Sequence, residues 1–180
     1  MAITRLAARD RMALHAFALS CVIGCLAAHA ANAAVSADEA YLDALQGTWL
    51  MEGMLGGAPV RYLADGQRVL QGGFIRLRMI DVESPPRYEA DVYIGFDPNA
   101  NDYVAHWLDR FGAAGARVVG RGERRGQVLV LSFPYAEGVF RDTLTWLPLS
   151  GSWTLLLEAQ RADGTWSTFA SYTLTRGAQH

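Results

Sequence analysis

Few side chains in this sequence could carry acid–base or nucleophilic chemistry. Of four histidines in 180 residues, only His106 and the C-terminal His180 follow the N-terminal stretch, and both cysteines lie within it. A nucleophilic triad needs a base within hydrogen-bond reach of a serine or cysteine. His106 and Asp109 are three residues apart, so an extended strand would place them on opposite faces. We therefore expect His106 to be a satisfied or solvent-facing histidine rather than a catalytic base.

The composition also argues against metal, haem and nucleic-acid sites. Zinc requires three or four converging His, Cys or carboxylate ligands, and haem would have His106 as its only internal axial candidate. All sixteen basic residues are arginines, which excludes a lysine Schiff base, and the net charge is −2 without a clustered basic face. We predict no catalytic residue, no metal, no cofactor and no nucleic-acid partner.

Aromatic residues give the strongest indication of a binding site. The chain has five tryptophans and seven tyrosines, and ligand pockets are lined by such side chains together with a few polar groups. The candidate ligand-binding residues lie on different predicted strands: Tyr88, Phe96, Tyr103, His106, Trp107, Phe140, Arg141, Trp146 and Trp153. The aromatic members could all point inward, with Arg141 or His106 orienting a ligand. The sequence leaves open whether they line a cavity or fill a core.

The elements that would position these residues are antiparallel strands. Segments of alternating polarity follow one another near 48–55, 59–65, 67–71, 73–82, 87–96, 102–110, 116–122, 127–133, 139–148, 152–160 and 165–176. Turn residues separate many of them, among them Asp65-Gly66 and Asp163-Gly164, and the latter favours a type I′ hairpin turn. Connections this short force antiparallel neighbours.

A meander of this length has two exposed edges unless it closes. We therefore predict an all-β fold, a single antiparallel up-and-down β-barrel of about ten strands over 47–177. A capping box at Ser36 and Glu39 predicts one short helix at 37–46 within an N-terminal segment 34–46. That helix is too short to be stable alone, so it should dock on an open end of the barrel.

Residues 1–33 have the pattern of a secretory signal peptide. Arginines precede an apolar run, and Ala31-Asn32-Ala33 fits the cleavage pattern. The expectation is removal of 1–33 and export to the periplasm or the medium, with no transmembrane span in the mature protein. Alternatively, Val22-Ile23-Gly24-Cys25 resembles a lipobox, in which case Cys25 would be lipidated and the protein anchored to a membrane.

Three motifs in order carry a family resemblance. They are Gly47-Thr48-Trp49 with Glu52-Gly53, then Tyr93-Ile94-Gly95-Phe96-Asp97, then the strand from Tyr103 through Trp107 to Asp109. Together they resemble the bacterial lipocalin-like family called domain of unknown function 1579, a calycin-type β-barrel with no established activity. The resemblance spans roughly 45–176, and the sequence departs from many members around 56–72.

The resemblance implies a particular barrel closure. Calycins tend to pack an arginine from the last strand across the tryptophan of the first, and Arg176 and Trp49 occupy those places. A guanidinium over an indole face contributes about 0.5–2 kcal/mol.

The resulting functional hypothesis is an exported, non-catalytic protein that binds a small hydrophobic molecule or lipid inside the barrel. One alternative is an enzyme acting on a small hydrophobic substrate through an inward pair such as Glu52 or Asp109 with His106. The other is an envelope interaction protein whose barrel is filled and has no pocket. Fold alone does not decide among them, and the sequence does not indicate the oligomeric state.

Overall fold

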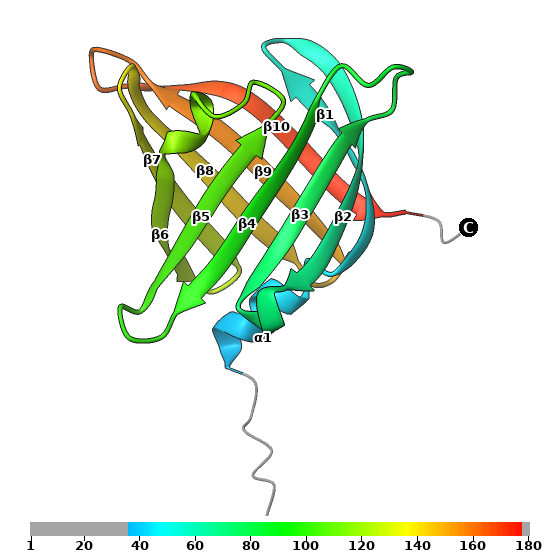
Figure 1. The fold of residues 1–180 in the computed structure, drawn as a ribbon, viewed down its shortest axis with the longest axis vertical. Helices are drawn as coiled ribbons and strands as arrows, with labels where there is room; N and C mark the ends of the chain where they lie inside the picture. The colour runs from blue at the N-terminus through cyan, green and yellow to red at the C-terminus, as the bar shows by residue number, and fades with distance from the viewer. Residues whose placement is uncertain (1–35, 178–180) are drawn as a thin grey trace, which may run out of the picture. The chain divides into compact units, whose positions relative to one another are not determined.

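The computed structural model of this chain describes residues 36–177, and it is a closed antiparallel barrel of ten strands preceded by one short helix (Figure 1). The predicted signal peptide, 1–33, and Cys25 lie outside the described residues. The elements, in chain order, are α1 (Ala37–Asp43), β1 (Gly47–Leu55), β2 (Ala58–Val69), β3 (Phe74–Asp81), β4 (Glu89–Asp97), β5 (Asp102–Asp109), β6 (Val119–Arg125), β7 (Val128–Tyr135), β8 (Gly138–Leu147), β9 (Ser152–Gln160) and β10 (Trp166–Arg176), with 3₁₀ turns at Leu70–Gly72 and Gly115–Arg117.

Closure occurs where β1 meets both its sequence neighbour and the end of the chain. Trp49 on β1 lies opposite Ala64 on β2 and opposite Arg176 on β10. Every strand is therefore hydrogen-bonded on both sides, and the exposed edges that a ten-stranded meander would otherwise present are absent from 36–177. The predicted all-β, up-and-down barrel of about ten strands is confirmed.

Strict alternation along the strands divides inside from outside. On β3, Ile75, Leu77 and Met79 are buried in the interior, whereas Arg76 and Arg78 between them are partly exposed on the outer surface. The same period of two places Ala90, Val92 and Ile94 of β4 inside. This follows from the pleat, because successive side chains of a strand point to opposite faces.

The prediction of a turn at Asp65-Gly66 is wrong, because 59–65 and 67–69 belong to one strand, β2, and the chain leaves that strand only at the 3₁₀ turn Leu70–Gly72. Gly66 is paired within the sheet and faces the interior, where a Cβ would lie only 2.0 Å from the carbonyl oxygen of Leu45. Glycine here permits the close approach of the segment after α1 rather than a change of chain direction. At Asp163-Gly164 the hairpin is present, but only Gly164 has a positive φ, so the turn is not type I′.

Helix α1 covers one end of the barrel. It is shorter than the predicted 37–46, and its apolar residues Tyr41 and Leu42, with Leu45 beyond it, are almost fully buried in the barrel core. The Tyr41 hydroxyl donates to the carbonyl of Leu144 at 2.9 Å. At the helix start, Ser36 Oγ accepts from the backbone N–H of Glu39 at 3.0 Å, as the capping box predicts.

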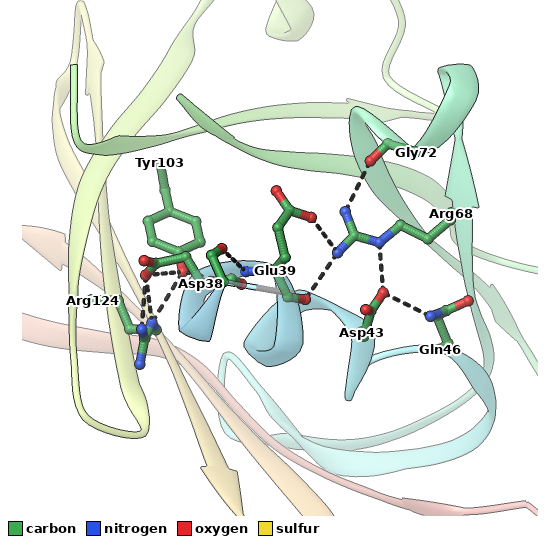
Figure 2. A network of polar contacts seen from close by, with 9 residues as sticks. Asp38, Glu39, Asp43, Gln46, Arg68, Gly72, Tyr103 and Arg124 are labelled. Atoms are coloured by element: carbon green, nitrogen blue, oxygen red, sulfur yellow. Dashed lines mark hydrogen bonds and ion pairs between the residues drawn. The ribbon is translucent and has the colours of Figure 1, made fainter. Parts of the chain in front are cut away.

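Two arginines hold α1 against the strands (Figure 2). Arg68 of β2 contacts the carboxylates of Glu39 at 2.6 Å and Asp43 at 2.7 Å, so Glu39 is engaged with the barrel. Arg124 of β6 contacts Asp38 at 2.8 Å and donates to the Tyr103 hydroxyl at 3.0 Å. The helix thus gains from the barrel the stability that seven residues cannot provide alone.

Arg176 and Trp49 lie against each other beside α1. The guanidinium carbon is 3.8 Å from the centroid of the Trp49 ring, and Nη1 donates to the Gln46 carbonyl at 2.5 Å. Gly47, with φ of 107°, leaves room for this side chain, because a Cβ there would lie 2.6 Å from Nη1. The arrangement joins the first strand, the last strand and the helix connection.

Candidate functional site

A cavity of about 580 Å³ opens at the end of the barrel away from α1. Figure 1 shows that end bounded by the β1–β2 hairpin and the connections after β3, β5 and β9. The walls come from residues near the strand termini, including Leu55 at the end of β1, Asp109 at the end of β5 and Phe140 near the start of β8. The two barrel ends therefore differ, since one is covered by α1 and the other is hollow.

Aromatic rings dominate the cavity wall. They are Tyr62, Tyr88, Trp107, Phe111, Phe133, Tyr135, Phe140, Phe169 and Tyr172. The rings contact one another in edge-to-face, tilted and stacked pairs; Tyr135 and Phe140, for example, meet edge to face, with centroids 5.6 Å apart and planes at 84°. Leu55, Met79 and Leu157 complete the apolar lining. Such a surface matches the general character of small-molecule pockets.

One polar chain crosses the wall from β5 to the segment before β4. Trp107 Nε1 donates to the Tyr88 hydroxyl at 3.0 Å, and that hydroxyl donates to Asp109 Oδ2 at 3.4 Å. Burial is the main cause that raises the pKa of Tyr88 above its usual range, so it keeps its proton. With its proton donated to Asp109 and one lone pair accepting from Trp107, the Tyr88 hydroxyl has one lone pair left to accept a hydrogen bond at the cavity wall.

Asp142 is the most unusual polar group of the cavity. It lies on the inner face of β8 between Phe140 and Leu144, and only 4% of the residue is exposed. Burial raises the pKa of its carboxyl to about 7, and burial is the only cause. Within 36–177 no arginine forms an ion pair with it, in contrast to Asp38, Asp43 and Asp81. A perturbed, unpaired group in a cavity is typical of functional sites.

Three of the predicted ligand-binding residues line this cavity, namely Tyr88, Trp107 and Phe140. Four others belong to the opposite end, where they pack around α1. Phe96 lies 5.1 Å from Tyr103 between ring centroids, and Trp146 lies 5.0 Å from Trp153. The indole of Trp153 also donates to the Ala44 carbonyl at 3.3 Å. These four residues fill the core at the α1 end. The candidate aromatic residues thus line a cavity at one end of the barrel and fill the core at the other.

His106 and Arg141 face outward, contrary to the expectation that either would orient a ligand. A ring N–H of His106 donates to the Ala116 carbonyl at 2.6 Å, which makes it a satisfied strand histidine. Arg141 pairs with Glu158 at 2.7 Å across the outer face and stacks 4.0 Å from the Trp166 ring. Both lie at outward positions in the alternation, because their strand neighbours Trp107 and Phe140 point inward.

The acid–base pair proposed for an enzyme is not assembled. Glu52 forms an ion pair with Arg61 at 3.0 Å, and both side chains are more than half exposed. Asp109 lines the cavity, whereas His106 lies on the other face of the same strand. Neither carboxylate can therefore exchange a proton with His106 within one site.

Sequence reasoning missed Asp142, Tyr62 and Tyr172. The alternation in 139–147 contained the signal for Asp142, since that residue occupies the same face as Phe140, Leu144 and Trp146. Tyr62 and Tyr172, with ring centroids 5.9 Å apart, lie on strands β2 and β10 that are neighbours of β1. Their proximity depends on closure of the barrel, and strand periodicity does not show it.

A second hollow, of about 810 Å³, lies on the outer surface beside β1, β2 and Arg176. It is larger than the barrel cavity, but its lining includes no buried unpaired carboxyl, and the solvent-facing Leu63 and Asp65 form part of its wall. The buried unpaired atom there is Nε of Arg78, whose guanidinium pairs with Glu89. We regard the barrel cavity as the site, because only there do burial, aromatic rings and an unpaired carboxyl coincide.

Among residues 36–177, no three His, Cys or carboxylate side chains are grouped so that they could hold a metal ion. The helices of this part of the chain are too short or too polar to cross a membrane. No family model matches the sequence, and comparison with the curated proteins finds no match.

Proposed function

We propose that this protein is an exported, non-catalytic binding protein that takes a small apolar or amphipathic molecule into the open end of its barrel. The observation that supports this is the aromatic cavity of about 580 Å³ at the end that α1 leaves free. Calycin-type barrels suit such a role because eight or more strands can enclose a ligand. A filled, pocketless barrel is disfavoured by the same cavity.

The driving force would be burial of apolar surface. A ligand that removes roughly 300 Å² of apolar area from water gains about 7 kcal/mol at ~25 cal/mol per Å², before the entropic costs of association. The rings, which pack against one another, fix the shape of the site, and the hydroxyl of Tyr88 offers a polar contact. That gain alone corresponds to a dissociation constant of about 10 µM, so with the costs of association the expected affinity is in the micromolar range or weaker.

Export and family membership are further parts of the proposal. The apolar run before Ala33 supports cleavage and transport, and the alternative is lipidation at Cys25. The mass of the mature N-terminus distinguishes the two, and an uncleaved chain in the cytoplasm would contradict both. The closed barrel with Trp49 and Arg176 at its seam supports membership in domain of unknown function 1579.

The binding proposal can be tested with N-phenyl-1-naphthylamine, a neutral probe that fluoresces in apolar sites. We expect saturable binding accompanied by energy transfer from Trp107, which lies in the cavity wall. Leu157→Trp should weaken binding at least about tenfold, because the indole would occupy cavity space.

Leu156→Trp is the matched control, since Leu156 is the preceding residue on β9 and points to the outer face. It should leave the affinity within about twofold. Circular dichroism establishes that both variants are folded. Absence of saturable binding to the wild-type protein, or equal binding by the Leu157 variant and the wild type, would overturn the proposal.

A further inference from the structure

The charged groups that line the barrel cavity all have the same sign. Asp109, Glu137 and Asp142 contribute carboxyl groups, and no arginine of residues 36–177 contributes to the wall. The sixteen arginines of the chain make this bias informative, because elsewhere arginine is the regular partner of buried or half-buried carboxylates. The cavity is therefore suited to a positive rather than a negative ligand group.

Asp142 is placed to make that contact. Only 4% of this residue is exposed, and it lines the cavity. Within the described part of the chain it forms no ion pair, and burial alone raises the pKa of its carboxyl. Its opposite residues in the sheet, Leu131 on β7 and Leu157 on β9, are apolar and cannot satisfy it. A carboxylate in such surroundings is costly unless a cation or a hydrogen-bond donor joins it.

Aromatic rings surround the same position. Phe140 is two residues away on β8, and Tyr135 lies 5.6 Å from it between ring centroids. Phe133 stacks beside Tyr135 at 6.3 Å. Ring faces attract ammonium groups, and the attraction grows when the cation is removed from water. A carboxylate beside aromatic rings can therefore bind a protonated amine, through a charge-assisted hydrogen bond and through cation–π contacts.

We propose that the ligand is an amphiphile with a protonated amine, which binds with the ammonium group against Asp142 and the apolar body along the aromatic wall. This rests on the proposed binding function and names its ligand class. Long-chain carboxylates, by contrast, would place like charges together in a site without a basic side chain. The structure therefore disfavours fatty acids as the ligand.

Binding of an amine should depend on pH in a defined direction. The groups that face the ligand from the surrounding elements are Asp142, Asp109, Glu137 and the hydroxyls of Tyr62, Tyr88, Tyr135 and Tyr172. Burial is the main cause that raises the pKa of each of these tyrosines, so they stay neutral. With the carboxyl pKa of Asp142 at about 7, its charged form is minor at pH 5.5 and dominant at pH 8.5.

The test compares three ten-carbon probes, decylamine, decanol and decanoate, for displacement of bound N-phenyl-1-naphthylamine. At pH 8.5 we expect decylamine to displace the dye at a concentration at least about tenfold lower than decanol, with decanoate the weakest. The affinity for decylamine should fall about tenfold or more between pH 8.5 and pH 5.5. Over this range Asp142 loses its negative charge, whereas the ammonium, with a pKa of about 10.4, stays charged.

Asp142→Asn should remove both the preference for decylamine and its pH dependence, while decanol binds within about threefold of its wild-type affinity. Glu123→Gln is the control, because Glu123 is an exposed carboxylate on the β6–β7 hairpin. It should leave all three affinities unchanged.

The outcomes separate the two levels of the proposal. Binding of the dye and of decanol without preference for decylamine overturns the amine assignment and leaves the binding function standing. The same holds if decanoate binds more tightly than decylamine, or if Asp142→Asn retains the preference. Failure of the dye and of all three probes to bind overturns the binding function itself.

Discussion

The two ends of the barrel are built from similar residues and yet differ in how their polar atoms are satisfied. Around α1, the hydroxyl of Tyr41 and the indole N–H groups of Trp49 and Trp153 all donate to backbone carbonyls. Tyr103 and Arg124 share Asp38. At the open end, the rings surround empty space, and Asp142 is buried without an ion pair among residues 36–177.

This difference indicates that the filled end stabilises the fold and the hollow end binds the ligand. A filled end with satisfied polar groups gives stability, because buried hydrogen-bond partners and close packing each lower the free energy of the folded state. A hollow end with a desolvated carboxyl sacrifices stability, and such sacrifices are typical of binding sites. Substitutions at the filled end should therefore mainly reduce stability, whereas substitutions at the hollow end should mainly change binding.

The largest expected effect is a difference in stability between two tryptophan substitutions, one at each end of the barrel. Trp49→Ala should lower the free energy of unfolding by about 3–5 kcal/mol, because a nearly fully buried indole, its bond to Leu45 and its contact with Arg176 are all lost. Trp107→Ala, at the hollow end, should cost clearly less and should instead reduce energy transfer to the bound dye. Denaturant unfolding of both variants measures this, and equal losses of stability would remove the distinction between the ends.

The second effect concerns Asp142 and pH. Its folded pKa of about 7 lies above the unfolded value of about 3.9, so its contribution to stability is fully present below about pH 4 and is lost as the pH rises through 7. The free energy of unfolding of Asp142→Asn, relative to that of the wild type, should therefore rise by about 4 kcal/mol as the pH is raised from 4 to 9.

Urea unfolding of both proteins across this pH range provides the measurement for Asp142. The same substitution at Asp38, which is paired with Arg124 at the filled end, should destabilise the protein near neutral pH. A stability difference between the Asp142 variant and the wild type that does not change with pH would show that this carboxyl is not desolvated.

The smallest effect tests the seam. Arg176→Ala should lower the free energy of unfolding by about 0.5–2 kcal/mol and the melting temperature by a few degrees, because it removes the contact with Trp49 and the bond to Gln46. Arg161→Ala, in the β9–β10 turn, is the control and should change little. An unchanged melting temperature for the Arg176 variant would mean that the seam does not depend on it.

Much of the fold could be predicted because the polarity of a strand alternates with its pleat. Alternation at 87–96 and 139–148 and the short connections led to an antiparallel barrel. The contact of Arg176 with Trp49 was implied by the resemblance to calycins, not by alternation. The apparent turn at Asp65-Gly66 was misleading, because the same glycine that can reverse a chain can also admit a neighbouring carbonyl, here that of Leu45.

The candidate site was only partly accessible in this way. Alternation correctly gave the inner faces of Tyr88, Trp107 and Phe140, and the same alternation places Asp142 on the inner face of β8. It could not tell Phe140 from Trp146 on the same strand, although one lines the cavity and the other packs near α1.

Local sequence is thus enough to specify which strand side chains face the interior, because the pleat has a period of two and depends on neighbouring residues alone. How far along the barrel axis each side chain lies, where α1 docks and where the cavity remains are properties of the folded barrel. Those properties depend on strand register and closure, which join Tyr62 to Tyr172 and Arg176 to Trp49 across more than a hundred residues.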